Sequence, residues 1–135
     1  MTKIFVVLFL TATQLGFGQT AKWKVYVHQT GDDAVGSRLA YAVKEQINRS
    51  TRYELTTREN AHVMIQLVSV DDSGAGATAL KSAVAVLETV GHGNPRTILQ
   101  QEVFVVGKDR VDDIASELLA DFDQAVTDYF RGAHP

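Results

Sequence analysis

Two segments of the chain place apolar residues at the spacing of a helix with one apolar face, and this pattern constrains the fold most. In residues 34–49 these positions are Val35, Leu39, Ala42, Val43 and Ile47. The second segment begins at Asp109 and ends near Gly132, and its apolar stripe comprises Val111, Ile114, Ala115, Leu118, Leu119, Phe122, Val126 and Tyr129. A helix that is apolar on one side must bury that side against another layer, so both segments need a sheet to lie on.

Four further segments predict the strands of that sheet. Residues 23–28 alternate between apolar and polar side chains, and residues 53–57 and 97–106 are rich in β-branched and aromatic residues. Residues 61–70 carry apolar side chains on both faces of the predicted strand, which is typical of a strand in the middle of a sheet.

Residues 78–90 fit two patterns. With a period of two they form a strand that carries Val84, Val86 and Val90, whereas with a period of 3.6 they form a helix whose face is Leu80, Ala83, Val84 and Leu87. The β-branched residues and the turn sequence at residues 91–95 favour a strand that pairs with residues 97–106 as a hairpin. Residues 74–79 match the pattern Gly-x-Gly-x-x-Ala of dinucleotide-binding loops, in which the glycines are followed by a helix. The match would therefore have the required context only if residues 78–90 were helical.

The order of these elements, β-α-β-β-β-β-α, predicts an α+β fold. The simplest arrangement is a two-layer sandwich, in which a mixed sheet of about five strands carries both helices on one face. The opposite face would then be open, and we expect Lys24, Tyr26, His28 and Gln66 to lie on it. The strand at residues 97–106 adds either the pair Gln100 and Glu102 or the single residue Gln101 to this face. Such a polar and aromatic face is either a solvated surface or a docking surface.

The N-terminus has the layout of a secretory signal peptide. Lys3 precedes the apolar run at residues 4–10, and Gly16 and Gly18 stand at the small-residue positions of a cleavage site. The run is far shorter than the roughly 20 residues that cross a bilayer; the alternative is a buried N-terminal strand. We therefore expect residues 1–18 to be a signal peptide and residues 19–135 to be a single domain that is periplasmic or secreted, with no membrane span after cleavage.

Composition excludes several classes of function. The chain has no cysteine, so it cannot carry a disulfide, a thiolate zinc site or a cysteine nucleophile. Its formal net charge of -3 gives no electrostatic footprint for nucleic acid. Its four histidines lack the spacing of a metal pair, and its paired aspartates lack the alternating donors of a calcium loop, so we expect no metal and no cofactor.

Three functional hypotheses follow. The leading one is a non-catalytic exported domain that binds an envelope or extracellular protein through its sheet face or through an edge strand such as residues 53–57. The second is a small hydrolase or ligand-binding protein that uses His28, His62 and a loop aspartate in one pocket. The third is a secreted enzyme inhibitor that presents the loop at residues 71–76 or at residues 91–95. The sequence does not decide the oligomeric state.

Three stretches add a resemblance to known proteins. Residues 35–45 (VGSRLAYAVKE), 61–65 (AHVMI) and 107–115 (GKDRVDDIA) together resemble small exported proteins of unknown function from Gram-negative bacteria. Such proteins often carry two cysteines where this chain has Val106 and Ile114, so the corresponding bridge is absent here. The order of a helix, a short strand and then a strand that begins with a small residue also resembles the N-terminal domain of periplasmic TolB, which is a protein-interaction module. The resemblance implies an α+β fold and a binding role, and no functional residue carries over.

Overall fold

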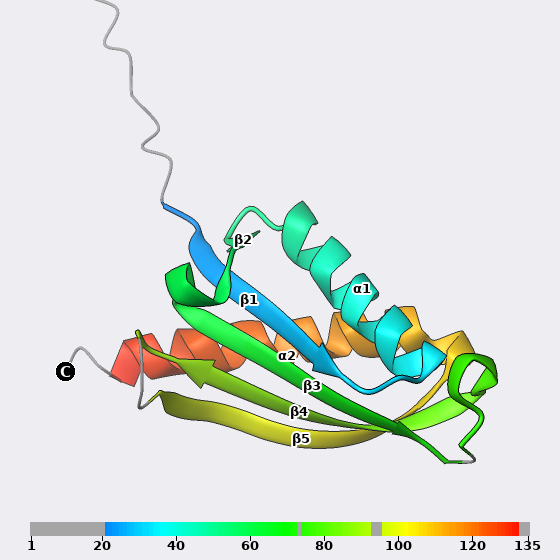
Figure 1. Ribbon diagram of the computed structural model, residues 1–135. Coiled ribbons are helices and arrows are strands. Elements are labelled where there is room, and N and C mark those ends of the chain that lie inside the picture. Colours follow the sequence, from blue (N-terminus) through cyan, green and yellow to red (C-terminus); the bar gives the residue numbers. More distant parts are fainter. Residues whose placement is uncertain (1–20, 73, 93–95, 133–135) are drawn as a thin grey trace, which may run out of the picture.

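The computed structural model describes residues 21–72, 74–92 and 96–132 (Figure 1). In chain order the elements are β1 (Trp23–Thr30), α1 (Ala34–Arg49), β2 (Tyr53–Leu55), β3 (Val63–Asp71), β4 (Lys81–Val90), β5 (Thr97–Gly107) and α2 (Val111–Gly132), with short 3-10 turns at Arg58–Asn60, Gly76–Thr78 and Lys108–Arg110. This order confirms the predicted α+β fold. The predicted signal peptide at residues 1–18 lies outside the described residues.

Residues 78–90 form a strand rather than a helix. Only Gly76–Thr78 turns as a 3-10 helix, and the chain then enters β4. The glycine-rich match at residues 74–79 is therefore followed by an antiparallel strand, which is not the context of a dinucleotide-binding loop.

The five strands of the described chain form one mixed sheet in the order β2-β1-β3-β4-β5. β1 lies between β2 and β3 and is parallel to both. The crossover from β1 to its neighbour β2 contains α1, and the connection from β2 to β3 passes over β1. β3, β4 and β5 then pair antiparallel, with an irregularity in the register between Glu88 and Thr89. As predicted, β3 is central and the short β2 is an edge; β5 is the other edge.

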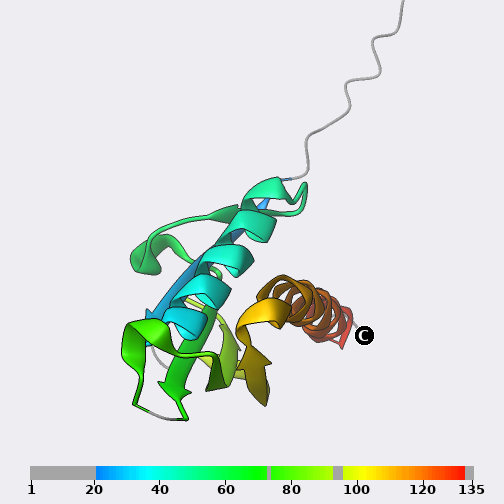
Figure 2. The same cartoon turned by 90° about the vertical axis from the view of Figure 1, so that its right-hand side faces the viewer.

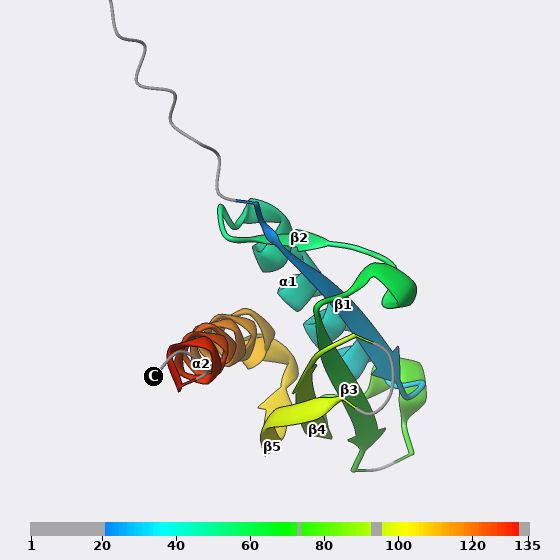
Figure 3. The same ribbon diagram turned by 90° about the vertical axis from the view of Figure 1, so that its left-hand side faces the viewer.

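Both helices cover the same face of the sheet, as Figures 2 and 3 show from two sides. α1 packs on β1, β2 and β3, while α2 packs against α1 and β5. One continuous core fills the space between the layers, and its largest fully buried side chains include Leu39, Ile47, Ile65, Leu118 and Phe122.

Local chemistry explains where the helices begin and end. The Asp33 side chain accepts a hydrogen bond of 2.7 Å from the Gly36 backbone N–H and so caps α1. α2 begins at Val111, two residues after the predicted start, because Lys108–Arg110 forms a 3-10 turn first. Asp112 and Asp113 occupy its first turn, where the helix dipole favours acidic side chains. Tyr129, which we expected on the apolar stripe, is 39% exposed near the end of this helix.

Candidate functional site: the open face of the sheet

The structure places Lys24, Tyr26, His28 and Gln66 on the sheet face that points away from the helices. On β1 these side chains alternate with Val25 and Val27, which are buried beneath α1. Gln66 lies beside His28 in the register of β1 and β3. The predicted residues thus share one face.

Side chains on β1 interact along this face. The Tyr26 and His28 rings are stacked with their centroids 6.1 Å apart, and the Tyr26 hydroxyl lies 3.5 Å from His28 Nδ1. Thr30 Oγ1 lies 3.3 Å from His28 Nε2. His28 itself is exposed, so its ring stands on an open surface and both ring nitrogens have polar neighbours.

The most prominent feature of this face was not predicted from the sequence. Two cross-strand rows of small apolar side chains run over β3, β4 and β5, and we call them the valine patch. One row is Val68, Ala85 and Val103, and the other is Val70, Ala83 and Val105. Val103 and Val105 are 76% and 74% exposed, and Val70 is 64% exposed. No helix of the described chain covers these rows.

The register decides which glutamine of β5 belongs to the open face. Gln101 pairs with Leu87 in the row next to the valine patch and lies on the open face. Gln100 and Glu102 pair with Glu88 and Val86, which are buried on the helix side. Of the two alternatives that the sequence left open, the one with Gln101 is therefore correct.

The structure does not bring His28 and His62 together. His62 lies beside Lys24 at the start of β1, whereas His28 lies beside Gln66, so about 13 Å of strand separates the two register positions at roughly 3.3 Å per residue. His62 Nδ1 accepts a 3.2 Å hydrogen bond from the Lys24 backbone N–H. Burial, and then the nearby His92 and Lys24, lower the pKa of His62. The placement gives no support to a pocket that uses both histidines.

His62 instead belongs to an aromatic cluster at that end of the sheet. Its ring meets Trp23 and His92 edge-on, at centroid distances of 5.7 and 4.9 Å. Trp23 in turn packs on Phe130 of α2 at 4.4 Å. Within residues 21–72, 74–92 and 96–132, no group of three or more histidine or acidic side chains is placed to hold a metal ion.

A polar cluster at the other end of the sheet holds the β1–α1 turn. Asp33 is only 3% exposed and accepts hydrogen bonds from the Gly36 N–H and from the Ser82 hydroxyl. Burial acts to raise the pKa of Asp33, but hydrogen bonds from Ser69, Ser82 and Gly36 outweigh it and the pKa is lowered. These contacts give the Gly36 N–H at the start of α1 a hydrogen-bond acceptor and join the helix to β3 and β4, which is a structural role.

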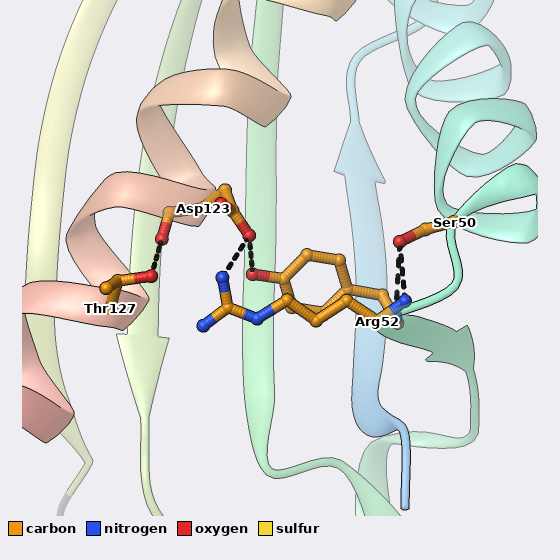
Figure 4. A network of polar contacts seen from close by, with 5 residues as sticks. Ser50, Arg52, Asp123 and Thr127 are labelled. Atoms are coloured by element: carbon orange, nitrogen blue, oxygen red, sulfur yellow. Dashed lines mark hydrogen bonds and ion pairs between the residues drawn. The ribbon is translucent and has the colours of Figure 1, made fainter. Parts of the chain in front are cut away.

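A second polar network clamps β2 to α2 (Figure 4). One carboxylate oxygen of Asp123 accepts 2.6 Å hydrogen bonds from both Arg52 and the Tyr53 hydroxyl. Thr127 donates to the Asp123 carbonyl, and Ser50 Oγ accepts from the backbone N–H groups of Arg52 and Tyr53. Burial, and then the hydrogen bond to Asp123, raise the pKa of Tyr53. These contacts join β2 to α2, which is a structural role.

A shallow hollow between the two helices completes the candidate sites. Its lining includes Arg38, Tyr41, Arg49, Asp112 and Ser116. A hydrogen bond of 2.8 Å from Gln46 to Ser116 joins the two helices within it. The hollow therefore follows the seam between the helices. The loops at residues 71–76 and 91–95, which we considered for an inhibitor, include residues outside the described part of the chain.

Comparison with known proteins identifies the fold. No family model and no curated protein sequence matches the chain. Among solved structures, TolB from Acinetobacter baumannii aligns with a TM-score of 0.56 and 12% identity over 80% of this chain, which spans only 29% of that protein. Protein XCC0632 from Xanthomonas campestris, described as family DUF330, aligns with a TM-score of 0.57 and 9% identity, covering 82% of this chain and 90% of that one.

The chain has a TolB-like fold. The resemblance to the N-terminal domain of TolB is therefore confirmed at the level of architecture, while identities this low carry no activity or partner with them. The resemblance to small exported proteins of Gram-negative bacteria stays a prediction. In the described residues, no helix combines the length and apolar character that crossing a membrane requires.

Proposed function

We propose that this protein is a non-catalytic, exported interaction domain that binds another protein of the cell envelope through the valine patch. The single observation that carries the proposal is the patch itself: six small apolar side chains stand in two adjacent rows on a sheet face that neither helix covers. Soluble monomers rarely leave a contiguous apolar surface without a use for it.

The surroundings of the patch suit a protein partner. Thr30 of β1 lies beside Val68, and Gln66 and Gln101 stand on either side of Leu87 in the row next to the patch. Polar side chains thus line part of its border, as they do at protein interfaces. The patch lies on the open surface of three antiparallel strands. An open sheet surface suits contact with another protein better than it suits a small molecule, which needs a concave site.

The leader-like N-terminus supports a periplasmic or secreted location. Lys3, the apolar run at residues 4–10 and the glycines at positions 16 and 18 follow the signal-peptide layout. The partner that we expect is therefore a protein that the domain meets after export, at the envelope or outside the cell.

Affinity capture with matched variants tests this function. Immobilised protein should retain a defined set of proteins from an envelope extract, and the double variant Val103→Lys/Val105→Lys should lose them. Tyr41→Lys is the matched control, because Tyr41 is 66% exposed on α1, away from the open sheet face. Retention of the same set by all three proteins, or no retention above blank beads, would overturn the proposal.

A further inference from the structure

The unpaired edge of the sheet at β5 is the starting point. β5 spans Thr97–Gly107, pairs with β4 on one side, and has no strand on the other side in the described chain. Figure 1 shows no described segment beyond β5 at that edge. Backbone N–H and C=O groups of an antiparallel edge strand alternate between the paired and the free side, so β5 presents a row of unused donors and acceptors.

This edge has only some of the devices that usually keep an edge strand from pairing. Between Thr97 and Gly107 there is no proline and no lysine, and the one charged residue, Glu102, points to the helix side. The register irregularity opposite Glu88 and Thr89 lies near the start of β5, whereas residues 100–107 pair regularly with β4. The opposite edge, β2, is only three residues long and so offers little to pair with. β5 is thus a long edge that remains available for an added strand.

Helix α2 lies over and beyond this edge. In Figures 2 and 3, α2 extends laterally past β5 on the helix side of the sheet. A strand added to β5 would therefore have α2 above one of its faces. Its other face would continue the open side of the sheet, next to Val103 and Val105 of the valine patch.

The space beneath α2 is lined by acidic side chains. Glu102 of β5 interacts electrostatically with Asp121 and Glu117 of α2, and burial together with these two charges raises the pKa of Glu102. Glu88 of β4, only 2% exposed, interacts with the same Glu102 and Asp121. None of these four carboxylates forms an ion pair with a lysine or arginine of the described residues.

Glu88 provides a second, independent indication that this acidic cluster lacks a partner within the described chain. Its Oε2 atom is buried and has no hydrogen-bond partner in the described part of the chain. Buried carboxylate oxygens are normally hydrogen-bonded, since leaving one unmet costs free energy. Glu102 accepts a hydrogen bond from the Gln100 side chain, but no cation balances the charges of Glu102, Glu117 and Asp121 in the described residues. These charges lie near the buried Glu88 oxygen that has no hydrogen-bond partner.

We propose that β5 binds an extended segment of a partner protein by strand addition, and that this segment alternates basic with apolar residues. The basic side chains lie beneath α2 and face Glu102, Glu117 and Asp121. The apolar side chains lie on the opposite face and extend the rows that end at Val103 and Val105. This inference rests on the proposed binding function and names the chemistry of its partner.

A second copy of the chain is the less suitable occupant. Pairing β5 with its own symmetry mate would set two α2 helices and two Glu102 side chains near the same interface. The acids on α2 would then face like charges, which disfavours association. A basic segment meets the same acids with opposite charge.

Synthetic peptides test strand addition directly. A short capped peptide of alternating arginine and valine is compared with a peptide of the same composition in block order and with an alternating glutamate and valine peptide. Binding is followed by fluorescence anisotropy at neutral pH. We expect only the alternating arginine peptide to bind, and we expect Glu102→Gln/Asp121→Asn to weaken it by about tenfold, as loss of two charge contacts would. Lys44→Gln on α1 is the control and should leave binding unchanged.

Two further readouts separate strand addition from charge attraction alone. N-methyl groups placed on alternate residues block one backbone edge of the peptide; of the two possible sets, one should abolish binding and the other should not. Amide hydrogen exchange should show new protection within residues 97–107. Equal binding by both N-methylated peptides, equal binding by the block-order peptide, or a native chain that sediments as a β5-dependent dimer would overturn the inference. Capture of envelope proteins that depends on Val103 would still support the valine patch in that case.

Discussion

Val68 of β3 and Val103 of β5 lie in one cross-strand row, with Ala85 of β4 between them, on the sheet face opposite both helices. The parallel row of Val70, Ala83 and Val105 doubles this surface. The domain therefore buries one face of its sheet beneath two helices and leaves an apolar stripe on the other. That asymmetry is the basis of the proposed role in binding.

Adjacent valines of β5 test the assignment of the two faces. Val105 is 74% exposed and Val106 is 0% exposed, because successive side chains of a strand point to opposite faces. Val105→Lys should change the free energy of unfolding by no more than about 0.5 kcal/mol. Val106→Lys should destabilise the domain by several kcal/mol, since it buries an unpaired charge. Urea denaturation of both variants measures this difference, and equal effects would show that the register of β5 is wrong.

The apolar face of α2 gives a second stability prediction. Leu118 is 1% exposed in the core, so Leu118→Asp should prevent cooperative folding. Ala120→Asp, on the exposed side of the same helix, should cost no more than about 1 kcal/mol. Circular dichroism and thermal melting distinguish the two. A cooperative transition for Leu118→Asp at the native temperature would contradict the packing of α2.

Buried Glu88 predicts how stability depends on pH. Burial, and then the charges of Glu102 and Asp121, raise the pKa of Glu88 to about 8 from a usual value of 4.5. Between these values the unfolded chain loses the proton while the folded chain keeps it, so stability falls as pH rises, by up to about 1.4 kcal/mol per pH unit. Below pH 4.5 and above pH 8 this contribution no longer changes.

Glu88→Gln isolates that effect. The variant keeps the shape of the side chain and removes its titration. Its free energy of unfolding, relative to that of the native protein, should therefore rise from about pH 4.5 and level off near pH 8. Glu54→Gln, on the exposed surface of β2, serves as the control and should give a difference that does not follow this window. Denaturation midpoints measured across pH 4 to 9 would contradict the placement of Glu88 if the two variants behaved alike.

Close packing at the start of α1 predicts the sign of a glycine substitution. Alanine usually stabilises a helix by about 1 kcal/mol relative to glycine. A Cβ atom on Gly36, however, would lie 1.9 Å from Ser69 Oγ and 2.3 Å from Ser69 Cβ. Gly36→Ala should therefore destabilise the domain by about 1–3 kcal/mol, as overpacking does.

A second substitution tests the cause. Gly36→Ala/Ser69→Gly removes the side chain that the new methyl group meets, so it should recover part of the lost stability in chemical denaturation. If Gly36→Ala alone stabilised the protein, the contact between α1 and β3 would be looser than the structure has it.

Much of the fold follows from sequence periodicity. Val35, Leu39, Val43 and Ile47 define the buried side of α1, and the β-branched residues of 81–90 favoured the strand that the structure contains. The valine patch could not be predicted from periodicity, because β4 and β5 carry apolar residues on both faces. Only the register of the two strands shows which of these residues the helices cover. The burial of Glu88 could not be predicted for a related reason: a glutamate in a strand is normally solvent-exposed, and its burial depends on segments that are distant in the sequence.

The separation of the two histidines also depended on strand order. Their positions near the ends of two predicted strands allowed a shared pocket, and the parallel pairing of β1 with β3 sets His62 beside Lys24 instead. Alternation alone predicts that Lys24, Tyr26 and His28 share the open face, because Val25 and Val27 of the same strand face the core, and the pairing of β1 with β3 adds Gln66.

Site-specific photo-crosslinking in cells that produce the full-length chain tests the binding role most directly. A photoreactive amino acid at position 103 samples the valine patch, and the same group at position 41 samples the exposed side of α1. Crosslinking from position 103, but not from position 41, to one defined envelope protein is the predicted result. Products that are absent at position 103, or identical at both positions, would contradict the assignment of the open sheet face as the binding surface.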